Sequence, residues 1–172
     1  MLLPEYILRT RARAVLYRNL GNGAFRDVSL DAGPGILELV PGRGLAIGDF
    51  DNDGDLDVAV NCVNDYPQLL RCDSSLNNRW LKVKCVGTKS NRTAIGARVY
   101  CTTPDGRRRM DEVRSGGSYF SQSDLRLHFG LGQSEKASLE IHWPSGLVEK
   151  MEGVAVNQIL RVVEGSLSAR TP

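Results

Sequence analysis

The stretch "AIGDFDNDGDLDVAV", residues 46–60, places five aspartates within nine positions, with hydrophobic residues on both sides. The flanking segments "GLAIGDF" (44–50) and "LDVAVNC" (56–62) are short apolar runs of strand length. The Asp, Asn and Gly residues between them are the types that favour turns. The stretch therefore predicts two β-strands joined by an acidic loop.

Short strand-like runs bounded by Gly, Pro, Asn and Asp recur along the rest of the chain, and helical periodicity is scarce. They are "AVLYRN", "WLKVKCVG", "GARVYCTT", "LRLHFGLG", "ASLEIHWPSG" and "NQILRVVEG", and "PDG" (104–106) predicts a hairpin turn into "RRRMDEVR". "VLYRN" (15–19) and "QLLRC" (68–72) also echo each other, as in a β-propeller repeat. This spacing predicts an all-β protein.

Length and composition allow one domain or two small ones, since the chain has 172 residues, 41% of them hydrophobic. The charge is uneven: residues 1–74 hold 7 Lys/Arg and 11 Asp/Glu, whereas residues 75–172 hold 15 and 9. This asymmetry indicates two modules with different surfaces. No apolar run approaches the roughly 18 residues of a membrane span. Pro4 and Glu5 interrupt the region where a secretory signal would be apolar, so we expect no signal peptide in this chain.

The acidic loop has the spacing of a calcium site. Oxygen donors fall at positions 1, 3, 5, 7 and 9 of the loop, which are Asp49, Asp51, Asp53, Asp55 and Asp57. Gly54 at position 6 permits a sharp backbone turn, as in calcium loops. An EF-hand is excluded because position 12 is Val60 rather than a bidentate Glu. The alternative is a solvated acidic turn without an ion, because "DNDGD" favours a turn by itself.

The pattern DxDxDGxxD is similar to the calcium-binding hairpin of FG-GAP repeats, which build integrin-type propellers. The preceding segment "LYRNLGNGAFRDVS" (16–29) resembles the strand-turn-strand that accompanies such repeats. The resemblance implies that Asp49, Asp51, Asp53 and Asp57 supply side chains to Ca²⁺. It also implies that Asp55 offers its backbone carbonyl.

Three segments of the second half resemble the ASPIC/UnbV domain. They are "NNRWLKVKCVGTKSNRTAIGARVYC" (77–101), "RSGGSYFSQSDLRLHFGLGQ" (114–133) and "LEIHWPSG" (139–146). With the FG-GAP-like segment before them, they resemble the cartilage acidic protein family of secreted matrix glycoproteins. The chain departs from that family in having about one FG-GAP-like repeat and no signal peptide. We therefore expect a truncated or alternatively spliced form.

The resemblance implies a partial propeller-type blade followed by a β-sandwich-like domain. We divide the chain into an unmatched segment (1–14), an FG-GAP-like region (15–76), an ASPIC/UnbV domain (77–165) and a tail (166–172). Alternating positions predict the core of the second domain, consisting of Trp80, Leu81, Val83, Val99, Phe129, Leu131, Ile141 and Trp143.

The same resemblance implies a non-enzymatic calcium-binding module of the extracellular matrix, with matrix proteins or acidic glycans as partners. Asn91 begins an N-glycosylation sequon, which matters if the chain is secreted. Arg107, Arg108 and Arg109 form a basic run that binds acidic glycans or is simply solvated. The run lacks interleaved aromatic residues, so nucleic acid is not an expected partner.

The rival hypothesis is a hydrolase or carbohydrate-active enzyme that uses "GGSYFSQSD" (116–124). Such an enzyme would gather Ser118, Ser121 and Asp124 with His128 or His142. The chain has no GxSxG nucleophile elbow in this region, and "GLGQSE" lacks the third glycine of a dinucleotide loop. We therefore expect no enzyme. A non-functional splice product is a further alternative.

The four cysteines contain no CxxC pair, and the chain has only two histidines, so a zinc site is not expected. The even count permits two disulfides, Cys85–Cys101 and Cys62–Cys72. Free thiols are the alternative.

Overall fold

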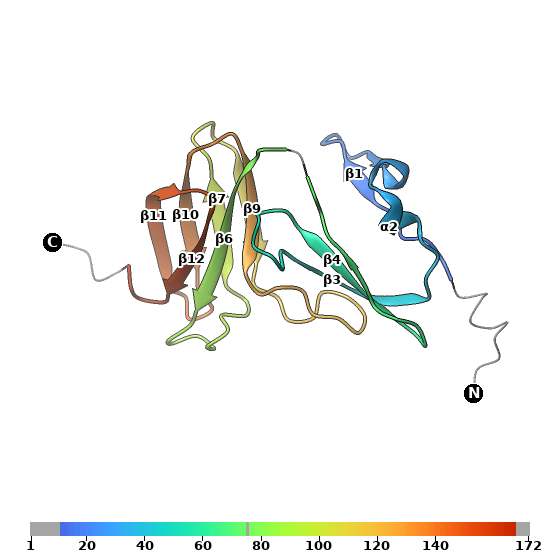
Figure 1. Ribbon diagram of the computed structural model, residues 1–172. Coiled ribbons are helices and arrows are strands. Elements are labelled where there is room, and N and C mark those ends of the chain that lie inside the picture. The colour runs from blue at the N-terminus through green and yellow to red at the C-terminus, as the bar shows by residue number, and fades with distance from the viewer. Residues whose placement is uncertain (1–10, 75, 168–172) are drawn as a thin grey trace. The chain divides into compact units, whose positions relative to one another are not determined.

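The computed structural model describes residues 11–74 and 76–167, and strands dominate it (Figure 1). The all-β prediction is confirmed. Most of the expected N-terminal segment and C-terminal tail lie outside the described residues. Within the described part, no helix has the length and apolar character needed to cross a membrane. The chain divides into two compact units, which we describe separately: Met1–Gly48, Leu56–Cys72 and Gly116–Gln122, and Asp49–Asp55, Asp73–Ser115 and Ser123–Pro172.

The first unit contains two small antiparallel sheets. One pairs β1 (Tyr17–Asn19) with β2 (Phe25–Asp27), and the short helices η1 (Ser29–Asp31) and α2 (Pro34–Leu37) follow. The other has the order β3-β4-β5, with β3 (Gly42–Gly48), β4 (Asp57–Cys62) and β5 (Gln68–Leu70). The two predicted strands on either side of the acidic loop are therefore β3 and β4.

The edge of β3 is covered by the loop 116–122, which is distant in sequence. A side chain at Gly44 would come within 2.7 Å of the Tyr119 carbonyl oxygen and 2.8 Å of that of Phe120. The Ser121 hydroxyl donates a hydrogen bond to the Leu45 carbonyl at 2.6 Å. Glycine at position 44 is therefore required for this close backbone approach.

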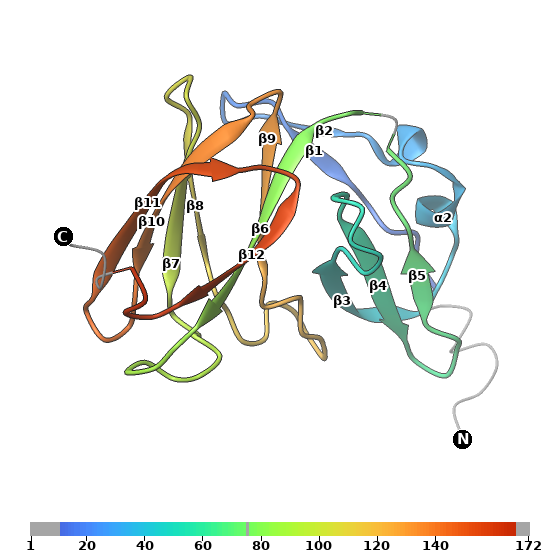
Figure 2. The ribbon, with the colours of Figure 1, turned by 60° about the vertical axis from the view of Figure 1, so that its left-hand side comes forward.

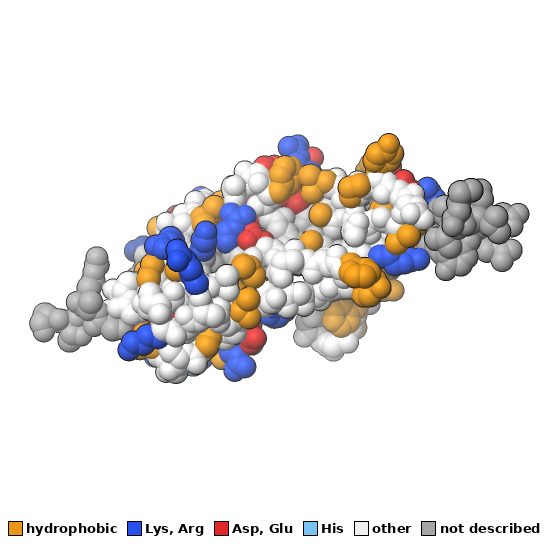
Figure 3. Space-filling model, turned by 90° about the horizontal axis from the view of Figure 1, so that it is seen from below, with side chains coloured by type: hydrophobic (Ala, Val, Ile, Leu, Met, Phe, Trp, Pro, Cys, Tyr) orange, Lys and Arg blue, Asp and Glu red, His pale blue; other side chains and the backbone are white. Residues whose placement is uncertain are grey.

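The first unit buries few large hydrophobic side chains. Val60 is buried, at 8% exposure, but many others lie at the surface. In Figure 3 hydrophobic side chains reach the surface at several separate points. The exposed members in this unit include Tyr17, Leu20, Phe25, Leu30, Leu39, Tyr66, Leu69, Tyr119 and Phe120. A set of this size indicates that the unit has only a small core of its own.

The second unit is a sandwich of two sheets (Figure 2). The four-stranded antiparallel sheet has the order β11-β10-β7-β8, and the three-stranded sheet has the order β12-β6-β9 with β12 parallel to β6. The strands are β6 (Arg79–Val86), β7 (Arg98–Thr102), β8 (Arg108–Glu112), β9 (Leu127–Gly132), β10 (Lys136–His142), β11 (Val148–Ala155) and β12 (Gln158–Val163).

Alternate residues from both sheets fill one core between them. Seven of the eight predicted core residues are buried: Leu81, Val83, Val99, Phe129, Leu131, Ile141 and Trp143. The eighth, Trp80, is only half-buried. Period-2 alternation explains the difference, because Trp80 lies on the opposite face of β6 from Leu81 and Val83.

Strand β11 is absent from the sequence-based strands. Its sequence "VEKMEGVA" carries three charged residues, so its apolar alternation is weak. Glu149 is nevertheless buried, because its carboxylate accepts hydrogen bonds from the Trp143 indole and from the backbone N–H groups of Gly165 and Leu167. A charge that is buried because of its hydrogen-bond partners cannot be recognised from hydrophobic periodicity.

A second buried carboxylate, Glu164, fixes the loop that follows β6. Its Oε2 atom accepts hydrogen bonds from the backbone N–H groups of Thr88, Lys89 and Ser90 at 2.7–2.8 Å. Its Oε1 atom accepts from the Ser90 and Ser145 hydroxyls. Burial raises the pKa of Glu164, but these hydroxyl and backbone donors outweigh it and lower the pKa to about 2.

The four cysteines form no disulfide in the structure, so neither predicted pairing is present. Cys85 lies on β6 and Cys101 on β7, which belong to different sheets. Both thiols are buried in the core instead of being cross-strand partners. Burial raises the pKa of Cys85 to about 12 and that of Cys101 to about 11.

Replacing Glu164 with Gln is expected to destabilise the second unit by about 2 kcal/mol or more at pH 7, because several charge-assisted hydrogen bonds are lost. The folded-state pKa is lowered, so this stability is fully present above the unfolded pKa of about 4.3 and is lost as pH falls toward 2. Thermal unfolding of wild type and Glu164→Gln between pH 7 and pH 2 should therefore converge at low pH. The exposed Glu152→Gln is the control, and a pH-independent difference would contradict this account.

The buried thiols are expected to resist alkylation in the native protein. With iodoacetamide at pH 8, Cys62 and Cys72, which are partly exposed, should react about tenfold or more faster than Cys85 and Cys101, because burial suppresses the thiolate. Peptide mapping of the time course measures the four rates. Equal rates would show that Cys85 and Cys101 are not buried in the native protein. Thiols that react only after reduction would show that the native protein contains disulfides.

Candidate metal centre

The acidic loop is the turn of the β3–β4 hairpin, which closes at the pair Gly48 and Asp57. Three backbone N–H groups of the loop donate to aspartate side chains: Asp53 to Asp51 at 3.4 Å, Gly54 to Asp49 at 2.9 Å and Asp55 to Asp53 at 2.9 Å. Gly54 has φ +102°, a left-handed conformation that favours glycine. The repeated Asp residues thus fold the loop by bonding to their own backbone.

Three of the five predicted ligands come together. Asp49, Asp51 and Asp57 each offer one carboxylate oxygen, and these oxygens lie within 4.8 Å of one another. Asp49 and Asp57 are buried, at 1% and 3% exposure, whereas Asp51 is exposed. Within the described part of the chain, the buried Asp49 Oδ1 atom has no hydrogen-bond partner. A buried anionic oxygen without a donor fits a site for a hard cation such as Ca²⁺.

The other two predicted ligands bond elsewhere in the loop and beyond it. The Asp53 carboxylate accepts from the Asp55 backbone, as described above, and the Asp55 carboxylate accepts from the Ser74 backbone N–H at 3.1 Å. Their side chains therefore support the turn in this structure. That Asp53 contributes a carboxylate and Asp55 a carbonyl to an ion stays a prediction.

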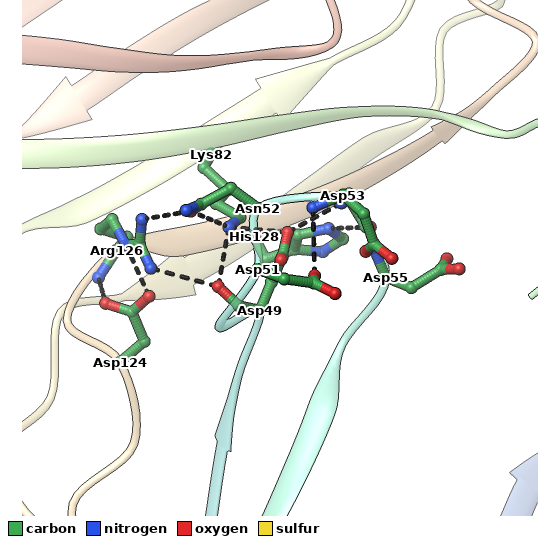
Figure 4. Close-up of polar contacts among 10 residues, drawn as sticks. Asp49, Asp51, Asn52, Asp53, Asp55, Lys82, Asp124, Arg126 and His128 are labelled. Atoms are coloured by element: carbon green, nitrogen blue, oxygen red, sulfur yellow. Dashed lines mark hydrogen bonds and ion pairs between the residues drawn. The ribbon is translucent and has the colours of Figure 1, made fainter. Parts of the chain in front are cut away.

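Lys82 of β6 reaches into the loop (Figure 4). Its Nζ atom lies 2.6 Å from Asp49 Oδ2, 3.2 Å from the Asp49 carbonyl oxygen and 3.0 Å from Asn52 Oδ1. Both side chains of the ion pair are buried, at 1% and 0% exposure. Burial raises the pKa of Asp49, but the Lys82 ammonium and the Gly54 N–H outweigh it, so the pKa is lowered overall.

Two residues of the 124–128 segment also hold the loop (Figure 4). Arg126 pairs with Asp124 at 2.6 Å and donates to Asn52 Oδ1 at 2.8 Å and to the Asp49 carbonyl at 3.3 Å. His128 Nε2 lies 2.8 Å from the Gly54 carbonyl oxygen. Because a carbonyl only accepts, this contact requires the tautomer, or the imidazolium, that carries hydrogen on Nε2.

Trp80 packs against the apex of the loop. A Cβ atom at Gly54 would lie 2.1 Å from the Trp80 ring, so only glycine fits there. The Trp80 ring stacks on His128 with 6.5 Å between centroids, and Lys82 Nζ lies 5.6 Å from its centre. This contact explains why Trp80 is half-buried although it lies outside the sandwich core.

The sequence pattern predicts the aspartates of the loop but not the residues that hold them. Trp80 and Lys82 alternate with core residues along β6, so the pattern assigns them to the exposed face of a strand. Arg126 directly precedes β9 and His128 lies within it, and both alternate with core residues in the same way. No local signal distinguishes these positions, because the loop that covers them is distant in sequence.

The side chains proposed for an enzyme are engaged in other contacts. Ser121 bonds to Leu45, Asp124 to Arg126 and His128 to Gly54, as described above. His142 Nε2 lies 2.6 Å from Glu140, and Ser118 is bridged to Ser121 through the backbone. These contacts give the side chains of Ser121, Asp124, His128 and His142 structural roles, whereas Ser118 takes part through its backbone.

The basic run on β8 and its turn also has intramolecular partners. Arg107 pairs with Asp105 at 2.8 Å. Arg108 lies 4.3 Å from the centre of the Tyr100 ring and 3.5 Å from Glu140. Arg109 donates to the Gly130 carbonyl. The ion pairs are largely exposed, so they hold these side chains only weakly.

Comparison with known proteins gives two family matches. Residues 3–60 match the FG-GAP-like repeat, and residues 87–169 match the ASPIC and UnbV family. The chain thus combines an FG-GAP-like repeat with an ASPIC and UnbV domain, which confirms the resemblance found in the sequence. The loop lies in the first match, whereas Trp80 and Lys82 lie between the two.

The chain is also similar to relatives that share one name. The chain is similar to Cartilage acidic protein 1 of Homo sapiens, at 32% identity over 146 residues, and of Xenopus tropicalis, at 34% over 120 residues. It is 29% identical over 165 residues to Cartilage acidic protein 1 of Mus musculus. These alignments cover 77%, 67% and 87% of this chain but only 22%, 18% and 25% of the relatives.

Replacing Gly54 with Ala is expected to displace the loop from Trp80. Gly106→Ala is the matched control, because Gly106 also has positive φ (+82°) but nothing lies within 4 Å of its Cβ position. In both variants an alanine must adopt a left-handed backbone conformation, which costs about 1–2 kcal/mol of folding stability. Gly54→Ala should lose about 1–3 kcal/mol more, because the added methyl group overlaps the indole ring. Thermal unfolding and tryptophan fluorescence measure the two effects, and equal losses would contradict the tight contact.

Proposed function

We propose that this chain is a non-enzymatic, calcium-binding module of an extracellular matrix protein. Two observations carry the proposal: the Asp49, Asp51 and Asp57 carboxylates converge, and the buried Asp49 Oδ1 atom has no donor among the described residues. Calcium takes six to eight oxygen ligands at about 2.3–2.6 Å, so such an ion also draws on further oxygens of the loop or on water. A bound cation relieves the mutual repulsion of these carboxylates.

The extracellular part of the proposal is supported by the relatives, whose name associates them with cartilage. The chain spans a quarter or less of the length of these relatives. We propose matrix proteins or acidic glycans as partners. Arg107 and Arg108 are available to acidic glycans, because their exposed ion pairs exchange readily.

A glycan at Asn91 belongs to the same proposal. In the structure the Asn91 side chain is exposed, but its amide nitrogen donates to the Ile95 carbonyl at 2.8 Å and its oxygen accepts from the Ile95 N–H. Modification after folding would have to break the first of these bonds. We therefore assign any glycosylation of Asn91 to the unfolded chain during secretion.

Calorimetric titration with Ca²⁺ tests the metal site. Wild type is expected to bind, and Asp51→Asn should weaken binding about tenfold or more, because it removes an exposed ligand charge without disturbing the buried ion pair. Asp31→Asn is the matched control, since Asp31 is an exposed carboxylate outside the loop. Asp53→Ala tests whether that side chain also contributes. Binding that is equal in all four proteins, or absent from wild type, would refute the site.

A further inference from the structure

We propose that the Lys82 ammonium is a built-in cation of the acidic loop, which holds Asp49 by one carboxylate oxygen and leaves the other for an external ion. The first part of this inference concerns the loop itself. The part in which one Asp49 oxygen is left for an external ion rests on the proposed calcium function.

The environment of the Lys82 ammonium resembles that of a bound cation. An ammonium group has three N–H donors and no acceptor. Three loop oxygens surround it: Asp49 Oδ2 at 2.6 Å, Asn52 Oδ1 at 3.0 Å and the Asp49 carbonyl at 3.2 Å. Every donor of this buried group therefore has an acceptor from the loop.

Strand β6, which carries Lys82, holds this ammonium group in a fixed position. Lys82 stands between Leu81 and Val83, both completely buried in the sandwich core, on a strand paired on both sides by β9 and β12. The Nζ atom therefore projects from a fixed backbone. A rigid support places the Asp49 carboxylate in one orientation, as a ligand group requires.

The two oxygens of Asp49 are used unequally. Oδ2 receives both Lys82 Nζ and the Gly54 N–H, at 2.6 and 2.9 Å. Oδ1 is buried and has no partner among the described residues. Lysine thus neutralises one side of the carboxylate, and Asp49 is also a member of the carboxylate cluster that contains Asp51 and Asp57.

This arrangement has a consequence for the loop without metal. Removing one partner of a buried ion pair leaves an uncompensated charge, which is strongly destabilising. As long as Lys82 is present, the Asp49 charge is compensated before any ion arrives. The loop should therefore keep its fold in the absence of calcium, and Lys82 acts as a positioning residue for the ion.

Hydrogen exchange of residues 49–55 in the full chain tests the inference. In EDTA, wild type and Lys84→Met should both protect the Gly54 amide, because Lys84 is an exposed lysine of the same strand. Lys82→Met in EDTA should exchange about a hundredfold faster at this amide. Equal protection in Lys82→Met and wild type, or a wild-type loop that is protected only with Ca²⁺, would overturn the role of Lys82.

A double variant guards against simple misfolding. Lys82→Met with Asp49→Asn removes both charges of the pair, so the second unit should regain thermal stability relative to Lys82→Met alone. Failure to regain it would show that Lys82 matters for packing rather than as a counter-charge. The double variant should also bind Ca²⁺ more weakly than wild type.

Calcium titrations separate this inference from the proposed function. If wild type does not bind Ca²⁺ but Lys82→Met still loses loop protection in EDTA, the built-in cation stands and the calcium function fails. If wild type binds Ca²⁺ and Lys82→Met keeps the same protection and the same affinity, the calcium function stands and the role of Lys82 fails.

Discussion

The buried ion pair between Lys82 and Asp49 is the interaction on which the candidate site depends. It fixes the first residue of the acidic loop, residues 49–55, on a strand of the sandwich, within the second compact unit. Such a pair contributes little net stability, since desolvation offsets its attraction, but it is costly to break. Its main effect is therefore on conformation, because it selects one orientation of the Asp49 carboxylate and one path for the loop.

The loop combines this long-range contact with local hydrogen bonds. Aspartate side chains accept from backbone N–H groups two or five residues further on, which stabilises the turn locally. Arg126, His128 and Trp80 then hold its two sides and its apex. Lys82 compensates Asp49, and backbone N–H groups of the loop bond to Asp51 and Asp53. Asp49, Asp51 and Asp57 remain close enough together to share one cation.

The sequence predicted the strands of the sandwich and its core well, because period-2 alternation reports burial directly. It predicted the acidic loop because the spacing of the aspartates is local. It failed for β11, where buried Glu149 breaks the apolar pattern, and for Trp80, which covers the loop rather than the core. It gave no indication of Lys82, because a lysine in an alternating strand is indistinguishable from an exposed one until the loop that buries it is known. These misses share one cause, a partner that lies far away in sequence.

Three buried carboxylates allow structural acids to be told apart from a candidate ligand. Glu164 uses both oxygens on backbone N–H groups and hydroxyls, and Glu149 uses both on the Trp143 indole and two backbone N–H groups. Asp49 is as deeply buried as either but leaves Oδ1 without a donor within the described residues. Since both oxygens of Glu164 and of Glu149 have donors, the unpaired oxygen of Asp49 does not reflect a general tolerance of unpaired oxygens in this fold. Asp49 also belongs to the cluster with Asp51 and Asp57, where a cation, rather than a hydrogen bond, would complete the environment.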